Sequence, residues 1–221
     1  MPGVQPVSSV EAELIYAFNG HIKCTDIKFQ SAGREDMDVR MIGSGRPFSL
    51  TFLNPVPDEN KPAPLSKQQF LQSFQEEIPT SIICNYGVSA YDLQATMQIP
   101  DMQPKHVKEY QCVVCCSRNI TDEMLNEIDS IENLTIQQKT PSRVAHRREM
   151  MYREKTILKM VTQRICANFF LLRLRTSSGT YIKEFVNSDF GRTRPSLGMI
   201  LDPSNPVECQ LMQLDVIYVG E

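Results

Sequence analysis

The second half of the chain contains a series of segments with strand-like composition, joined by short connections. Runs of aliphatic and β-branched residues, several alternating with polar residues, predict strands in this half at 110–116, 157–165, 169–175, 180–185 and 210–219. Few of the intervening segments could hold the crossover helix that parallel strands require. The pattern therefore disfavours a doubly wound parallel sheet. It predicts an α+β fold with a mixed, mostly antiparallel central sheet and flanking helices.

The first half has fewer strand-like segments and more turn residues. It predicts a helix that begins in a capping box at residues 8–11, strands at 22–30 and 48–52, a proline-rich surface loop at 55–64 and a helix from Ser66. Another helix, capped by Thr121, is expected to carry apolar residues as far as Leu134. The length of 221 residues suits one large domain, so we predict a single domain over residues 1–221.

The composition indicates an ordinary globular protein rather than a membrane or secreted one. The chain is 41% hydrophobic and 22% charged, and it has no apolar run of about 18 residues that could span a membrane. No signal peptide is visible at the start, so we expect an intracellular protein, nuclear or cytoplasmic, with reduced cysteines. The cluster Cys112, Cys115 and Cys116 lacks a second ligand pair, and we interpret it as a buried strand rather than a metal site.

The net charge of −3 conceals a strong separation of charge along the chain. Residues 139–194 contain 13 Lys and Arg but 4 Asp and Glu, a net charge of +9, so the remainder carries −12. A basic stretch on a mildly acidic protein favours a face that binds a polyanion. The alternative is that basic strands pair with acidic helices as an ordinary solvated surface.

The segment from Gly33 to Arg40 carries the densest charge in the chain. Its alternating acids and bases, between two predicted strands, suggest ion pairing near a cleft. Asp36 and Asp38 suit a carboxylate pair for acid–base chemistry, or they serve only as partners of Arg34 and Arg40. The segment does not end in the Gly-Lys-Ser/Thr of a phosphate-binding loop.

A second polar segment runs from Gly179 to Phe185. If it is a strand, Tyr181, Lys183 and Phe185 share one face. A Lys and a Tyr together suit a polar cleft, where Lys binds an anion and Tyr stacks. An edge strand whose Lys points to water is the alternative.

The third segment, Lys139 to Arg148, is basic and contains a proline. It is predicted to be a loop, and its charge suits contacts with phosphates. The alternative is a solvated charge run without a ligand.

Taken in order, these segments resemble a pseudouridine synthase. Gly33-Arg34-Glu35-Asp36 is similar to the Gly-Arg-x-Asp active-site motif of that superfamily, and residues 179–183 resemble the Gly-Thr-Tyr-Ile-Arg strand of the TruB branch, with Lys in place of Arg. The longer strings at 33–40, 139–148 and 179–196 are more specific. They resemble the archaeal and eukaryotic tRNA pseudouridine synthases of family ten, from about Ser8 to the C-terminus.

The resemblance implies a pseudouridine synthase fold with an RNA-binding cleft. It also implies isomerisation of uridine to pseudouridine in the TΨC loop of tRNA, with no cofactor and no metal. The catalytic aspartate of the family corresponds to Asp36, its base-stacking tyrosine to Tyr110, its second substrate-contacting tyrosine to Tyr181 and its basic partner to Lys183. Asp38 has no catalytic role in that pattern, and we assign it to loop structure together with Arg40.

The chemistry agrees with these roles. Breaking the N1–C1′ bond and rejoining the uracil through C5 needs an ionised carboxylate beside the ribose, acting as nucleophile or base, and a nearby cation such as Lys183 keeps it ionised. A stacked aromatic ring retains the detached base. The residues expected to hold the surrounding RNA are Arg143, His146, Arg147, Arg148, Arg192 and Arg194.

Two other hypotheses accompany this one. Family members usually carry an N-terminal domain with a THUMP module and a cysteine metal site, and we expect neither in this chain. The second hypothesis is therefore an RNA-binding protein that keeps the synthase fold but lacks turnover because that domain is missing. A metal-dependent nuclease that uses Asp36 and Asp38 is the third hypothesis, and it requires inhibition by a chelator.

Overall fold

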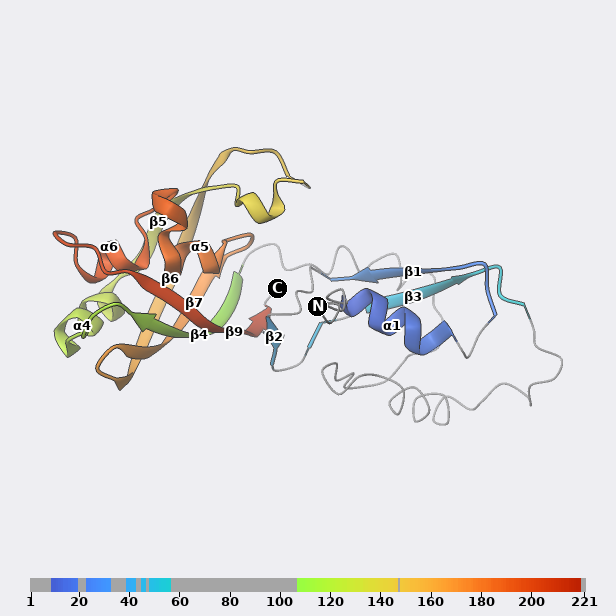
Figure 1. The fold of residues 1–221 in the computed structure, drawn as a ribbon, viewed down its shortest axis with the longest axis horizontal. Coiled ribbons are helices and arrows are strands. Elements are labelled where there is room, and N and C mark those ends of the chain that lie inside the picture. The colour runs from blue at the N-terminus through green and yellow to red at the C-terminus, as the bar shows by residue number, and fades with distance from the viewer. Residues whose placement is uncertain are drawn as a thin grey trace, which may run out of the picture. The chain divides into compact units, whose positions relative to one another are not determined.

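The computed structural model describes residues 9–19, 23–32, 39–42, 45–46, 48–56, 107–146 and 148–219 (Figure 1). The chain divides into two compact units, one formed by residues 1–38 and 44–103 and the other by residues 39–43 and 104–221. Each unit is described by itself. The prediction that residues 1–221 act as one catalytic domain stays a prediction.

The described part of the first unit is one helix and a two-stranded sheet. Helix α1 (Val10–Asn19) begins after Ser9, whose Oγ accepts a hydrogen bond from the Ala12 N–H at 3.0 Å. The cap is therefore one residue later than the predicted capping box, because Ser9 is the hydroxyl that reaches the free N–H of the first turn. Strands β1 (Asp26–Ser31) and β3 (Phe48–Leu53) pair antiparallel, and their small core includes Leu14 and Ile27.

The second unit is built on a seven-stranded sheet. Its strands are β2 (Arg40–Met41), β4 (Val107–Cys116), β5 (Glu132–Lys139), β6 (Tyr152–Cys166), β7 (Phe169–Ser177), β8 (Thr193–Arg194) and β9 (Cys209–Val219). They lie in the order β2-β9-β4-β7-β6-β5-β8, and every neighbouring pair is antiparallel except β2 and β9. This arrangement confirms the predicted mixed, mostly antiparallel sheet.

Three short helices contribute to the core of the second unit. These are helices α4 (Asp122–Ser130), α5 (Ile182–Asn187) and α6 (Leu197–Leu201), labelled in Figure 1. Their buried apolar residues share one core cluster with one face of the sheet. On β4 this face carries alternate residues, from Tyr110 through Cys112 and Val114 to Cys116, and all four are buried. The cysteine cluster therefore belongs to a buried strand, as predicted, and burial raises the pKa of Cys112 to about 12.

The predicted strand at 180–185 is wrong. The segment forms the end of a turn and then α5. Gly179 has φ +76°, and the Thr180 hydroxyl donates to the Ser177 carbonyl at 2.8 Å, so the chain leaves the sheet at the end of β7. Ile182, Phe185 and Val186 then follow helical rather than alternating spacing, and all three are buried.

The helix expected to continue to Leu134 ends earlier. Helix α4 has Thr121 as its N-cap, as predicted, with the Thr121 Oγ1 accepting from the Met124 N–H at 3.3 Å. It stops at Ser130, and Asn133 adopts a left-handed φ of +52° at the start of β5. Strand β5 was not predicted, because its inward-facing positions include a glutamine, Gln138, which gives no apolar alternation.

Several predictions fall outside the described residues. These are the helix from Ser66, the proline-rich loop beyond Val56, Asp36, Asp38 and Arg147. In the described ranges no helix combines the length and the apolar character needed to cross a bilayer. The six cysteines in those ranges are free thiols.

An ion pair fastens β2 to the sheet. Arg40 donates from Nε to Asp215 Oδ1 at 2.7 Å and from a terminal nitrogen to Oδ2 at 2.8 Å, and Gln213 donates to Oδ2 at 2.6 Å. The Asp215 side chain is only 1% exposed, whereas that of Arg40 is 64% exposed. The hydrogen bond from Arg40 lowers the pKa of Asp215 against the opposing effect of burial.

We predict that Arg40→Gln destabilises the fold in a pH-dependent manner. The lowered pKa of Asp215 stabilises the wild type above the unfolded aspartate pKa of about 3.9, and this contribution disappears as the pH falls below that value. The deficit of the variant should therefore be larger in urea denaturation at pH 7 than at pH 3. Lys159→Gln is the control, because its partner Glu132 is exposed. An equal deficit at both pH values would contradict the assignment.

Gly198 allows a close approach between α6 and the chain before β9. A Cβ built at this residue would lie 1.8 Å from the Val207 carbonyl oxygen. The Gly198 carbonyl also accepts from the Val207 N–H at 3.1 Å, so the two backbones are fixed against each other.

Gly198→Ala should therefore lower the free energy of unfolding by about 1–3 kcal/mol, because backbone atoms must move to admit the methyl group. Urea denaturation at pH 7 measures the change. Met199→Ala, at a half-buried position of the same helix, is the comparison and should cost less. Equal stability of wild type and Gly198→Ala would disprove the close contact.

Candidate functional site

The candidate site residues that the structure describes in the second unit gather at one end of its sheet. Strand β4 begins at this end and β7 finishes there, with Val107 opposite Ser177. Strands β5 and β6 meet there as well, with Lys139 opposite Tyr152, and the loop between them extends beyond the sheet (Figure 1). Helix α5 follows directly after β7. We call this the α5 end of the sheet.

Tyr110 lies on the helix-covered face near the α5 end. Its neighbours across the sheet are Leu174 on β7 and Val216 on β9, and Val216 is in turn opposite Met41 on β2. The tyrosine is 9% exposed and shares the core cluster with Ile182 of α5. Its position is thus set by the sheet register on both sides.

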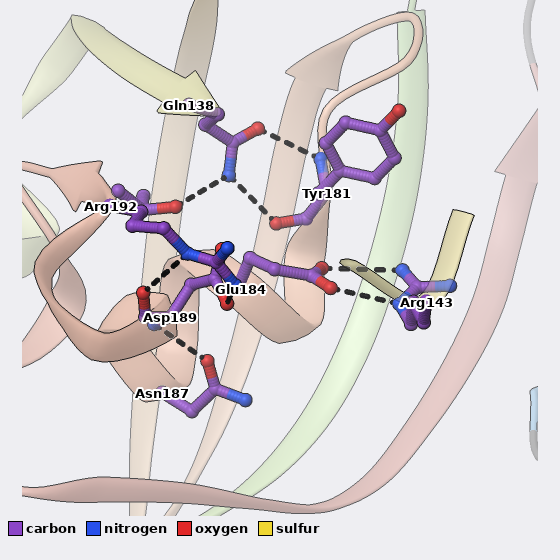
Figure 2. A network of polar contacts seen from close by, with 8 residues as sticks. Gln138, Arg143, Tyr181, Glu184, Asn187, Asp189 and Arg192 are labelled. Atoms are coloured by element: carbon purple, nitrogen blue, oxygen red, sulfur yellow. Dashed lines mark hydrogen bonds and ion pairs between the residues drawn. The ribbon is translucent and has the colours of Figure 1, made fainter. Parts of the chain in front are cut away.

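Tyr181 is held by a side chain that sequence reasoning missed. The amide of Gln138, which is 1% exposed, accepts from the Tyr181 N–H and donates to the Tyr181 carbonyl, both at 2.9 Å (Figure 2). Gln138 thereby bonds to this residue much as a neighbouring strand would. The Tyr181 hydroxyl is buried and finds no hydrogen-bond partner among the described residues. A buried polar group without a partner needs an explanation, and a ligand that bonds to it is one.

Arg143 forms an ion pair with a buried acid beside Tyr181. Its Nε donates to Glu184 Oε1 at 2.8 Å and a terminal nitrogen donates to Oε2 at 3.2 Å (Figure 2). The guanidinium carbon also lies 5.9 Å from the centre of the Tyr181 ring, within the range of a cation–π contact. The contact ties the basic loop after β5 to α5. An acid thus offsets the charge of an arginine that we predicted to bind RNA.

Arg192 is similarly engaged within the protein, whereas Arg194 is more open. Arg192 donates to Asp189 Oδ1 at 2.6 Å and to the Asp189 carbonyl at 3.2 Å (Figure 2). Arg194 is exposed, and its Nε donates to the Gly191 carbonyl at 2.9 Å. Both residues follow η2 (Ser188–Gly191), the 3₁₀ segment that comes after α5.

The loop between β5 and β6 presents the other predicted RNA contacts. It contains η1 (Ser142–Val144), anchored by the buried Val144, and then the exposed His146 and Arg148. Arg147, between them, lies outside the described residues. This outcome fits the loop predicted for residues 139–148.

Two further cations at the start of β6 were missed. Lys155 donates to the Ser178 carbonyl at 2.8 Å, and Arg153 donates to Thr140 Oγ1 at 2.6 Å. Burial lowers the pKa of Lys155, and the charges of Arg153 and Arg148 lower it further. Both Lys155 and Arg153 precede the strand predicted at 157–165, so no predicted element included them. Mutual repulsion among Lys155, Arg153 and Arg148 favours the binding of an anion beside them.

Lys183 lies in the first turn of α5 and is half-buried. Its proposed partner Asp36 is outside the described residues, so the pair stays a prediction. Within the ranges that the structure describes, no three His, Cys, Asp or Glu side chains gather as metal ligands would.

Comparison with known proteins identifies the family. The family model described as "Pus10, C-terminal" matches residues 4–220.

The chain belongs to the Pus10 C-terminal family.

Proteins named tRNA pseudouridine synthase Pus10 are among its relatives. The one from Xenopus laevis is 36% identical over 95% of this chain and 39% of its own length. The one from Methanocaldococcus jannaschii is 35% identical over 96% of this chain and 44% of its own length. This chain therefore spans about two fifths of these Pus10 relatives.

Part of the chain also resembles a solved structure. A chain of a Cbf5-Nop10-Gar1 complex covers 55% of this chain and 33% of its own length, with a TM-score of 0.42 and 18% identity. Similarity at that level adds no argument about function.

For this Pus10-family chain we predict that Gln138→Ala lowers the free energy of unfolding by about 1–3 kcal/mol, because it leaves the Tyr181 N–H and carbonyl without their partner. Gln138→Glu is the matched variant. Its side chain still accepts from the Tyr181 N–H but no longer donates to the Tyr181 carbonyl. Chemical denaturation of both variants measures the loss. If Gln138→Ala were as stable as wild type, the amide would not be what holds Tyr181.

Proposed function

We propose that this chain carries the catalytic part of a tRNA pseudouridine synthase, which isomerises uridine in the TΨC loop without a cofactor. The observation that carries the proposal is the family match over residues 4–220, together with relatives named tRNA pseudouridine synthase Pus10. The gathering of aromatic and basic side chains at the α5 end supports it.

Asp36 is the carboxylate that we propose for the chemistry. It acts beside the ribose while the N1–C1′ bond breaks and the C5–C1′ bond forms. The length of the chain permits this role. Arg40 is paired with Asp215, and the four peptide steps from Asp36 to Arg40 span at most about 14 Å. Met41 and Tyr110 both lie opposite Val216, so about 10 Å of sheet separates their backbones.

Tyr110 and Tyr181 supply the aromatic surface in this proposal. Tyr110 stacks on the uracil after it leaves the ribose, which prevents the base from diffusing away. Tyr181 contacts the substrate, and its buried hydroxyl, unpartnered among the described residues, supports that role because a bound ligand would satisfy it. Lys183 stabilises the ionised form of Asp36.

The basic loop after β5 holds the RNA around the extruded nucleotide. Arg148, together with Arg153 and Lys155, contacts phosphates. Burial and then the charges of Arg153 and Arg148 lower the pKa of Lys155, and a bound phosphate would offset that repulsion. His146, Arg147 and Arg194 extend this surface. Arg143 and Arg192 act mainly by positioning, through Glu184 and Asp189.

The first test is release of tritium from C5-labelled uridine in a tRNA transcript. Only isomerisation at C5 frees that label, so the assay reports chemistry rather than binding. We expect release by the wild type and background release by Asp36→Asn, with tRNA affinity unchanged in the variant. Asp38→Asn is the matched control and should retain activity, because Asp38 has a structural role in the proposal.

The same experiment separates the alternatives. Loss of both binding and activity in a folded Asp36→Asn protein would argue against Asp36 as the catalytic carboxylate. Salt-sensitive tRNA binding without release by the wild type would favour an RNA-binding protein that lacks turnover. Cleavage of the transcript that a chelator abolishes would favour a nuclease.

A further inference from the structure

The segment after α5 has an unusual backbone. Four consecutive residues, Ser188, Asp189, Phe190 and Gly191, have φ values of 64°, 49°, 55° and 81°. This is a full left-handed turn, and only its last residue is glycine. Residues with a Cβ adopt this conformation at a cost in free energy, and they do so as single residues far more often than in series. Strain of this kind concentrates at functional sites.

Several hydrogen bonds maintain the turn. The Asp189 N–H donates to Asn187 Oδ1 at 3.0 Å, and Arg192 bonds to both the carboxylate and the carbonyl of Asp189 (Figure 2). Arg194 donates to the Gly191 carbonyl. The Lys139 N–H donates to the Arg192 carbonyl at 3.3 Å, which connects the turn to β5. The turn is thus an ordered feature with a defined orientation.

The turn exposes an aromatic ring. Phe190 is 97% exposed, more than any other large apolar side chain in the described ranges. Phe185, in the preceding helix α5, is fully buried. The protein therefore maintains a strained backbone and gains no burial of the ring in return. The contrast indicates that the ring has a ligand.

We propose that Phe190 is a stacking platform for an unpaired base of the RNA substrate. The chemistry around the ring favours RNA over a protein partner. The exposed Arg194 packs over Gly191, directly after the ring, and Asp189, the acid directly before the ring, is already paired with Arg192. An exposed ring beside cations is the combination that proteins use for single-stranded nucleic acid, where the ring stacks on a base and cations meet the backbone.

The location agrees with this role. Strand β8 follows the turn and pairs with the end of β5, with Thr193 opposite Gln138, the residue that holds Tyr181. Phe190 therefore belongs to the α5 end of the sheet. The ring would bind a nucleotide other than the reacting uridine, whose base is assigned to Tyr110. This inference rests on the proposed function, because the ligand is the same RNA.

The test uses the absence of tryptophan from the sequence. Phe190→Trp introduces a single indole, and stacking on a base should quench its fluorescence when a tRNA transcript is added. Ile165→Trp is the control, since Ile165 is 53% exposed at the opposite end of β6, and its fluorescence should not change. A fully paired RNA duplex should quench the Phe190→Trp protein much less than the transcript does.

Affinity measurements on three variants identify the interaction. Phe190→Ala should weaken tRNA binding about 5- to 150-fold, the range for loss of one stacked base. Phe190→Tyr should bind like the wild type. Phe190→Leu, which keeps apolar bulk without an aromatic face, should resemble the alanine variant. All should unfold at the same denaturant concentration as the wild type, because the ring is exposed.

The outcomes separate this inference from the function on which it rests. Suppose that the wild type binds tRNA and releases tritium. Unquenched fluorescence of the Phe190→Trp protein, with full affinity in Phe190→Ala, would then overturn the stacking site and leave the synthase intact. Full tRNA binding by Phe190→Leu would overturn it as well, because apolar bulk without an aromatic face would then be sufficient. If the wild type failed to bind tRNA, both proposals would fall, whereas binding without tritium release would overturn the synthase and leave the stacking site to be decided by the same variants.

Discussion

Strand β4 is the element on which the rest of the second unit depends. It is hydrogen-bonded to β9 on one side and to β7 on the other along nearly its whole length. A shift of one residue in either register would turn Tyr110 out of the core, because side chains alternate across a strand. The pairing with β7 also places the end of β7 beside the start of β4, and Tyr181 and α5 follow from that point of the chain. The positions of Tyr110 and Tyr181 thus depend on the pairing of the strands more than on the side chains that contact them.

The sequence predicted the strands better than it predicted the segments between them. Periodicity located β4 and β7 because each buries alternate apolar residues. It also located β9, where the buried Asp215 lies between two buried apolar residues. It missed β5, where the buried Gln138 takes the place of an apolar residue, and it assigned a strand to what is α5. The motifs selected Tyr110 and Tyr181, which both lie near the α5 end of the sheet, and their contact with substrate stays a prediction. They gave no sign of Gln138, since a hydrogen bond between residues 43 positions apart leaves no local pattern.

The roles of the arginines were the hardest part to predict. A sequence reports how many charges a segment carries but not which of them are already paired. Two of the four acids between 139 and 194, Glu184 and Asp189, are engaged by Arg143 and Arg192. The first pair joins the loop after β5 to α5, whereas the second closes the turn at η2 within three residues of the chain. The arginines that looked alike in the motif therefore divide into those that organise the protein and those that face outward.

The ion pair between Arg40 and Asp215 has a consequence for how the protein is made. Its partners are 175 residues apart, so the hydrogen bonds of β2 cannot form until β9 has left the ribosome. The motif that begins at Gly33 is synthesised long before the aspartate that anchors its end. A nascent chain halted before β9 would carry every residue of the motif and lack this anchor. Synthesis of β9 is therefore the event that secures the motif.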